Sequence, residues 1–202
     1  MARAASEARK IAVLTSGHGR GSNLRALHQA FAQNNWPLRI AFATASRDKV
    51  PVVRLCAGLG LPCHILNPCC QEAFEARLLE LCREERIELI ALAGFMKLLS
   101  PTFLDQVGVP VLNIHPALLP AHGGPGMYGI RVHEAVFAAG ERFSGATVHL
   151  VDPLYDHGKI IAQAKVDISD CLSPEAIAAR VLEVEHRLYA AAIHNFLGPG
   201  WP

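Results

Sequence analysis

Short apolar runs alternate with segments of helical periodicity through the first half of the chain, and this alternation constrains the fold more than any other feature. The runs that we expect to be strands cover residues 11–15, 38–44, 63–66 and 87–93. The segments between them repeat their apolar residues at helical spacing. Such alternation predicts right-handed βαβ units around a parallel sheet, in which the nearly all-apolar run 87–93 is buried on both faces.

The second half of the chain follows a different pattern. Residues 146–151 and 159–168 are predicted strands joined by so short a connection that they must be antiparallel. A helix is expected over 131–139, and another begins at Ser173, whose hydroxyl can cap it. We therefore predict an α/β fold with a Rossmann-like, mostly parallel twisted sheet, helices on both faces and an antiparallel C-terminal strand pair.

Composition and charge exclude several classes of protein. The 202 residues carry a formal net charge of +1, and the charged residues are scattered, which argues against a nucleic-acid or membrane-surface protein. No apolar run reaches the roughly 18 residues of a membrane span, and the first ten residues lack a secretory signal. The six cysteines have no regular spacing. We expect reduced thiols, a cytoplasmic location, and one domain over 1–202 in which residues 1–9 are disordered.

Two polar side chains end a buried strand at residues 111–115. Asn113 and His115 are two positions apart, so they lie on one face of that strand, and Pro116 ends it. The carboxyl ends of strands are where ligands bind in open parallel sheets. The stretch therefore predicts a functional site built on Asn113 and His115.

A glycine-rich turn at residues 16–23 joins the first strand to the first helix. Glycines at 17, 19 and 21 let the backbone approach an anion, while Ser22 and Asn23 can donate hydrogen bonds or cap the helix. A phosphate site is the favoured interpretation, and an ordinary tight turn is the alternative. A dinucleotide site fits less well, because the last glycine falls one place early and no acid precedes Asp48 at the end of the second strand.

The loop at residues 94–101 leaves the end of the buried strand 87–93 and is mostly apolar. It suits a flat heterocyclic ligand, and packing into the core is the equal alternative. The ten histidines lack a metal-ligand motif, so we expect no metal; His133 and His149 are expected to be surface or satisfied core residues. A Ser-His-Asp hydrolase is also excluded, because no Gly-x-Ser-x-Gly elbow is present.

The remaining candidates for catalytic residues are Asn113, His115 and an acid from the turn that contains Asp156. An amide and an imidazolium suit the oxyanion that forms when a carbonyl is attacked, and a nearby carboxylate favours the charged imidazole. No protein nucleophile is then required. We therefore expect direct acyl transfer to an amine that the substrate supplies.

These motifs resemble the phosphoribosylglycinamide formyltransferases, within the folate-dependent formyltransferase superfamily. The resemblance covers about residues 11–196 and is carried by Asn113-x-His115-Pro116, the downstream Asp156, and Gly21-Ser22-Asn23. It implies formyl transfer from 10-formyltetrahydrofolate, a co-substrate, to the amine of glycinamide ribonucleotide in purine synthesis. The implied partners are these small molecules, with no nucleic acid and no membrane, and the protein would be a monomer or homodimer.

The resemblance also implies a role for each matched residue, with a phosphate-binding half up to about residue 110 and a folate and catalytic half from about residue 90. Asn113 would bind the formyl oxygen, His115 would donate a proton, and Asp156 would raise the pKa of His115. Glu185 would meet the substrate amine. The other implied residues are Gly21, Ser22 and Asn23 for the substrate phosphate, and Met96, Lys97, Leu98, Leu99 and Gln71 for the folate.

The sequence departs from that family in three places. The glycine-rich turn is two residues longer, Gln71 stands where many members have a folate-contacting Arg, and 121–131 lacks the common His-x-His pattern. Two alternatives to glycinamide ribonucleotide formylation stay open. One is a formyltetrahydrofolate hydrolase or a formyltransferase with another amine acceptor, and the other is a non-catalytic nucleotide-binding module.

Overall fold

The computed structural model describes residues 8–16, 19–67 and 70–198, which contain seven strands and six helices. By internal contacts the chain divides into two compact units. The first comprises Met1–Lys97 and Asp105–Pro110, and the second comprises Leu98–Leu104 and Val111–Pro202. Of the segment 1–9 that was expected to be disordered, residues 1–7 lie outside the described residues, whereas Arg9 already belongs to the first strand.

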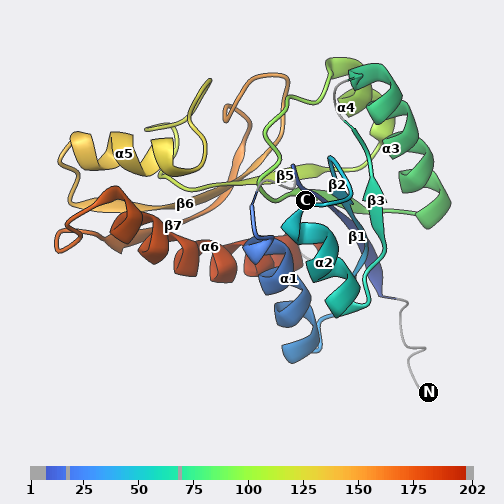
Figure 1. The fold of residues 1–202 in the computed structure, drawn as a ribbon, viewed down its shortest axis with the longest axis horizontal. Coiled ribbons are helices and arrows are strands. Elements are labelled where there is room, and N and C mark those ends of the chain that lie inside the picture. Colours follow the sequence, from blue (N-terminus) through green and yellow to red (C-terminus); the bar gives the residue numbers. More distant parts are fainter. Residues whose placement is uncertain (1–7, 17–18, 68–69, 199–202) are drawn as a thin grey trace. The chain divides into compact units, whose positions relative to one another are not determined.

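The first unit is a parallel sheet in the order β3-β2-β1-β4. Its strands are β1 (Arg9–Leu14), β2 (Leu38–Ala45), β3 (Cys63–Ile65) and β4 (Leu89–Leu92). The connecting helices are α1 (Ser22–Gln33), α2 (Pro51–Leu59) and α3 (Gln71–Glu85). In Figure 1, α3 lies on the opposite side of these strands from α1 and α2. The predicted βαβ units are confirmed.

Apolar side chains hold this unit together on both faces of the sheet. Phe42 of β2 and Ile90 of β4 have no exposed surface, and α1 buries Leu24, Leu27 and Phe31, the residues whose spacing predicts the helix. Burying a side chain of this size contributes roughly 1.5–3 kcal/mol. The strand ends are thereby fixed, and with them the loops that follow β1 and β4.

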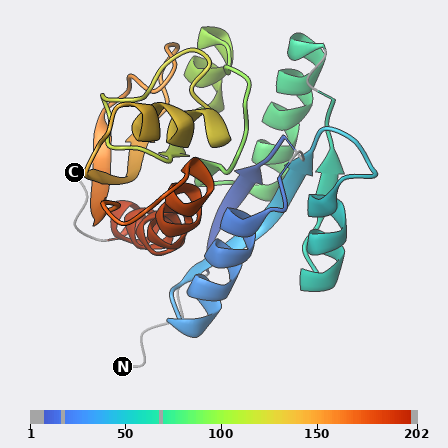
Figure 2. The same cartoon turned by 60° about the vertical axis from the view of Figure 1, so that its left-hand side comes forward.

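The second unit holds three antiparallel strands in the order β5-β6-β7. They are β5 (Val111–His115), β6 (Phe143–Leu150) and β7 (Ile160–Asp167). The helices α5 (Ile130–Ala138) and α6 (Pro174–Leu197) lie side by side (Figure 2), and α6 packs on β6 and β7. Residues of both helices belong to one cluster of buried residues: Val136, Ile168, Ile177 and Val181.

The predicted antiparallel pair is confirmed as β6–β7, and β6 is also antiparallel to β5. The Ser173 cap is confirmed, because its hydroxyl accepts a hydrogen bond from the Ala176 amide at 3.2 Å. One helix, α4 (Pro101–Val107), was not expected. Within the described residues, no helix is both long and apolar enough to cross a membrane.

Candidate active site

Strand β5 carries Asn113 and His115 as expected, and the helix α6 contacts this strand. The Tyr189 hydroxyl of α6 donates a hydrogen bond of 2.9 Å to the carbonyl oxygen of Leu112, next to Asn113. The Tyr189 side chain is fully buried, and His115 is only 3% exposed, whereas Asn113 is half-buried. The site is therefore built on a rigid strand.

The turn that follows β5 is fixed by polar side chains from β6 and β7. The hydroxyl of Thr147 donates to the Ala117 carbonyl oxygen at 2.7 Å and accepts from the Leu119 amide at 3.0 Å. The Gln163 amide group donates to the Leu119 carbonyl oxygen at 2.8 Å. Every one of these groups is buried or partly buried, so breaking the network would leave polar atoms without partners.

Asp156 is the acid of the site, and its backbone is in the left-handed region at φ 55°. One carboxylate oxygen, Oδ2, lies 3.4 Å from His115 Nδ1 and accepts a hydrogen bond of 3.0 Å from the Gly124 amide. The other, Oδ1, lies 3.6 Å from His149 Nε2. Burial opposes ionisation, but the contacts with His115, His149 and the Gly124 amide outweigh it, so the pKa of Asp156 is held well below its ordinary value.

Both ring nitrogens of His115 face acceptors. Nδ1 faces the Asp156 carboxylate, and Nε2 lies 2.9 Å from the carbonyl oxygen of His122. A neutral imidazole carries one N–H, so only the protonated ring donates to both. The surroundings of His115 therefore suit the imidazolium that the sequence predicts.

The tautomer of His149 fixes the orientation of Asn113. Nδ1 of His149 lies 2.8 Å from the Leu150 carbonyl oxygen and must donate to it. In the neutral ring Nε2 is then an acceptor, and it lies 3.1 Å from the Asn113 Nδ2 group but 3.6 Å from Asp156. The neutral ring can accept a hydrogen bond from Asn113 at this nitrogen, whereas only the protonated ring can donate from it to Asp156. One hydrogen of the Asn113 amide remains for another acceptor.

The glycine-rich loop before α5 is built against this site. Gly123 has no room for a side chain, because a methyl group there would lie 2.5 Å from Leu119 Cδ2 and 3.3 Å from the Asp156 Cβ. The His122 ring lies 3.6 Å from the Glu141 carboxylate. The loop therefore brings the His122 carbonyl oxygen close to His115 and the Gly124 amide close to Asp156.

Glu185, the remaining predicted site residue of this unit, lies on α6 and is 8% exposed. It is one helical turn before Tyr189, so both side chains lie on the face of α6 that packs on the sheet. Its role towards an amine stays a prediction.

The predicted phosphate-binding residues belong to the first unit. Gly21 has φ 72° and is itself the N-cap of α1, so the alternative that Ser22 or Asn23 caps the helix is wrong. Ser22 and Asn23 instead form the first turn of α1, the part of a helix whose backbone N–H groups can bind anions. Gly17 and His18 of the same turn lie outside the described residues.

The loops after β1 and β4 are hydrogen-bonded to each other. The Ser16 amide donates to the Gly94 carbonyl oxygen at 3.2 Å, and the Met96 amide donates to the Ser16 hydroxyl at 2.9 Å. Phe95 stacks on Phe74 of α3 with ring centroids 5.7 Å apart. Ser16, at the start of the predicted phosphate turn, is thereby hydrogen-bonded to the start of the predicted folate loop.

The predicted folate-binding residues differ in exposure. Met96 is 40% exposed and Lys97 is also exposed, whereas Leu98 is half-buried and Leu99 is 2% exposed. Any contact of Leu99 with a ligand would therefore involve its backbone. Gln71, the first residue of α3, donates a hydrogen bond of 3.0 Å to the Glu75 carboxylate.

Comparison with known proteins identifies the family. The formyl transferase family matches residues 9–193, which is most of the chain. This chain is a member of the formyl transferase family.

Several relatives of this formyl transferase carry one name. A Bacillus subtilis protein named phosphoribosylglycinamide formyltransferase is 35% identical over 193 residues, which cover 94% of this chain and 95% of the relative. A chloroplastic protein of that name from Arabidopsis thaliana is 34% identical, and the match covers 92% of this chain. This chain spans 64% of the length of the Arabidopsis relative and 60% of that of a similar Vigna unguiculata protein.

Solved structures confirm the predicted fold class of this formyl transferase. The crystal structure of a phosphoribosylglycinamide formyltransferase from Bacillus halodurans has a TM-score of 0.84 and 31% sequence identity, covering 95% of this chain and 96% of its own. One from Brucella melitensis has a TM-score of 0.83 and 33% identity, with 94% and 96% covered. The fold is therefore that of a known group of enzymes.

Sequence analysis missed His149 as a site residue of this formyl transferase. His149 is opposite Asn113 in the antiparallel register of β5 and β6, and it also faces Asp156. The available signal was a histidine near the end of a mostly apolar predicted strand, as His115 is in residues 111–115. His157, next to Asp156 in sequence, points elsewhere: its side chain is 70% exposed and its Nδ1 lies 2.9 Å from Asp152.

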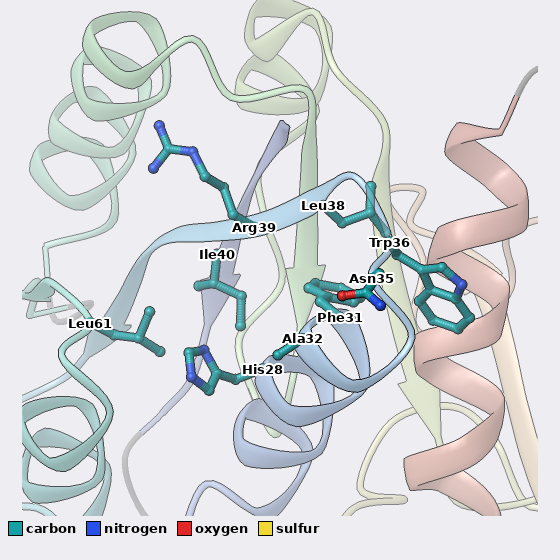
Figure 3. A pocket seen from close by; sticks show the side chains of 9 residues that line it. All are labelled: His28, Phe31, Ala32, Asn35, Trp36, Leu38, Arg39, Ile40 and Leu61. Atoms are coloured by element: carbon teal, nitrogen blue, oxygen red, sulfur yellow. The ribbon is translucent and has the colours of Figure 1, made fainter. Parts of the chain in front are cut away.

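A cavity of about 440 Å³ lies in the first unit, where β2 begins (Figure 3). It is lined by His28, Phe31, Ala32, Asn35, Trp36, Leu38, Arg39, Ile40 and Leu61. Figure 3 shows the Arg39 guanidinium pointing away from Ile40 and Leu61. None of the predicted site residues lines this cavity.

Proposed function

We propose that this formyl transferase moves the formyl group of 10-formyltetrahydrofolate to the amine of glycinamide ribonucleotide, a step of purine synthesis. The observation that carries the proposal is the continuous set of contacts from Asn113 through His149 and Asp156 to His115. Such an arrangement presents an amide donor and an imidazolium without a nucleophile, as direct acyl transfer requires. The names of the Bacillus and Arabidopsis relatives support the same acceptor and the same transferred group.

In the proposed reaction the substrate amine attacks the formyl carbon and forms a new C–N bond. The carbonyl oxygen becomes an oxyanion that accepts hydrogen bonds from the remaining Asn113 amide hydrogen and from His115. Each donor of this kind typically contributes about 2.7–4 kcal/mol. The bond from carbon to the folate nitrogen then breaks, and the proton lost by the amine passes to that nitrogen through His115 or through water near Asp156.

One contact must be exchanged before His115 can donate to the oxyanion. Its Nε2 lies 2.9 Å from the His122 carbonyl oxygen, while its Nδ1 faces Asp156. The formyl oxygen would replace that carbonyl as the acceptor for Nε2. Asp156 would favour the charged ring before the attack and keep the ring oriented throughout, because its carboxylate contacts Nδ1 on the opposite side of the ring.

The remaining roles belong to the same proposal. Ser22 and Asn23, with Gly21, would hold the substrate phosphate at the start of α1, and Glu185 would bind the substrate amine. Met96, Lys97, Leu98, Leu99 and Gln71 would contact the folate. The expectations of no metal, of a monomer or homodimer and of a cytoplasmic location stay predictions, and the plant relatives are named chloroplastic.

An absorbance assay for tetrahydrofolate release, with and without glycinamide ribonucleotide, tests the proposal. We expect release that depends on the acceptor and is matched mole for mole by formylated glycinamide ribonucleotide. Release without the acceptor would show a formyltetrahydrofolate hydrolase. No release at all would contradict any role as a formyl transferase.

A further inference from the structure

The loop after β5 places one of its own carbonyl groups against the donor nitrogen of His115. The carbonyl oxygen of His122 lies 2.9 Å from Nε2, the nitrogen that the proposed reaction assigns to the formyl oxygen. Because His115 is 3% exposed, its N–H group needs an acceptor from the protein when no ligand is bound. One N–H hydrogen makes one strong hydrogen bond. The His122 carbonyl oxygen and the formyl oxygen are therefore competing acceptors.

The backbone of His122 is in an unfavourable conformation while it makes this contact. Its φ is 56°, in the left-handed region, which few residues other than glycine adopt. Such a conformation persists only where the surrounding structure fixes it. The next residue, Gly123, packs against Leu119 and Asp156. The Gly124 amide then donates a hydrogen bond of 3.0 Å to the Asp156 carboxylate, so the chain after His122 is fixed from this side.

The side chain of His122 is held by a different element. Its Nε2 lies 3.6 Å from a carboxylate oxygen of Glu141, which is within ion-pair distance. Glu141 follows the C-terminal end of α5, and its amide donates to the Val136 carbonyl oxygen of that helix at 3.4 Å. The end of α5 therefore gives the Glu141 carboxylate a defined starting point. The contact fixes the imidazole of His122 and, through its backbone, the carbonyl group on His115.

We propose that Glu141 is a positioning residue that acts through His122 and opposes the binding of the formyl oxygen. It keeps the His122 carbonyl group on His115 in the ligand-free enzyme. The formyl group binds only to molecules in which that carbonyl group has left Nε2, so the apparent affinity falls with their fraction. Loss of the Glu141 contact raises this fraction and tightens binding. The inference rests on the proposed function and adds to it the residue that resists the exchange of acceptors.

Equilibrium binding of two folates without the acceptor substrate tests the proposal, because one of them has no formyl oxygen. In Glu141→Gln we expect the Kd for 10-formyltetrahydrofolate to fall about two- to fivefold, an effect of the size that a partly exposed ion pair produces. The Kd for tetrahydrofolate should be unchanged, since this ligand does not compete with the His122 carbonyl oxygen. Weaker binding of both folates, or an unchanged Kd for the formyl folate, would overturn the proposal.

Further variants test whether His122 transmits the effect. His122→Asn removes the imidazole but keeps a residue type that tolerates the left-handed region, so it should reproduce the result of Glu141→Gln. The double variant should bind no more tightly than either single variant, because both substitutions remove one contact. Glu134→Gln is the matched control, since it removes an exposed carboxylate of α5. Equal tightening in Glu134→Gln and Glu141→Gln would show a general effect of charge and contradict the positioning role.

Hydrogen exchange measures the carbonyl contact without any folate. The hydrogen on Nε2 of His115 should exchange with water faster in Glu141→Gln than in the wild type, by about the factor by which the Kd falls. Nuclear magnetic resonance of protein with isotope-labelled histidine makes the measurement. Equal exchange rates would overturn the role of Glu141. A protein that binds neither folate would contradict the proposed function, and the exchange rates would still decide whether Glu141 holds the carbonyl group.

Discussion

At the residue scale, Asp156 organises the site, because it contacts two imidazoles and one backbone amide. Its left-handed backbone aims the carboxylate at the Gly124 amide and at His115. With its pKa well below the ordinary value, the carboxylate keeps its charge throughout the neutral range. His115 is therefore held beside a permanent negative charge in a buried environment, where such a charge is weakly screened.

His115→Ala and Asp156→Asn should each lower kcat by about 10²–10⁴-fold, because the first removes the proton donor and the second removes the charge that orients it. Steady-state rates and circular dichroism would check this prediction. His157→Asn is the matched control, since His157 is adjacent to Asp156 but exposed and paired with Asp152. Near-wild-type rates in either of the first two variants would refute the assigned roles.

At the element scale, β5 is the strand on which the site depends, and α6 secures it through Tyr189. The hydroxyl of this buried residue donates to the Leu112 carbonyl oxygen. The contact joins a helix near the C-terminus to a residue adjacent to Asn113. The position of the amide donor is thus set by a bond that spans 77 residues of sequence.

Tyr189→Phe should lower the free energy of unfolding by about 1–3 kcal/mol, because it removes a buried hydrogen bond and leaves a carbonyl oxygen less well satisfied. Urea denaturation would measure the change. Tyr155→Phe removes a hydroxyl from a residue that is 41% exposed, and it should alter stability by less than about 0.5 kcal/mol. Equal effects of the two substitutions would contradict the role of Tyr189.

Most elements were predictable from sequence because their apolar residues repeat with a clear period. The helix α4 was not, since its seven residues are too few to establish a helical period. Strand β6 begins at Phe143, three residues before the predicted start, and includes Gly145. A side chain at Gly145 would collide with the Ala164 carbonyl oxygen, so this glycine permits close strand approach where glycine usually weakens a strand pattern.

At the scale of the whole molecule, the pH dependence of unfolding should report on His133. This residue of α5 is 5% exposed, and its Nδ1 has no hydrogen-bond partner among the described residues. Burial, and next the charge of His115, lower its pKa from 6.5 to about 4. His133 is therefore an exception to the expectation that most histidines are surface or satisfied core residues.

Between pH 6.5 and about 4 the unfolded chain binds the His133 proton and the folded chain does not. Protonation of His133 therefore does not affect the free energy of unfolding above pH 6.5. Below pH 6.5 it lowers the free energy of unfolding as the pH falls, by up to about 3 kcal/mol. Urea titrations across this range should show a shallower decline for His133→Gln than for the wild type. His157→Asn should follow the wild type, and an unchanged slope in His133→Gln would contradict the assignment.

The site itself was only partly predictable. Asn113, His115 and Asp156 stand out because polar residues end an apolar strand or follow one closely, and the structure joins them through His149. His149 was not predicted as a site residue, because its contact depends on its pairing opposite Asn113 across two strands. The apolar pattern of one strand does not show how that strand pairs with another. The contacts of His122 and Gly124 could not be predicted from residue type either, since they are made by backbone atoms.

The most direct test of charge stabilisation at the formyl oxygen is kcat for formyl transfer in Asn113→Ala. We predict that kcat falls about 10²–10³-fold, while the KM for the folate changes little, because the amide donor acts mainly on the charge of the transition state. A kcat within a few-fold of the wild type would contradict this mechanism. A rise in KM without loss of kcat would contradict it equally.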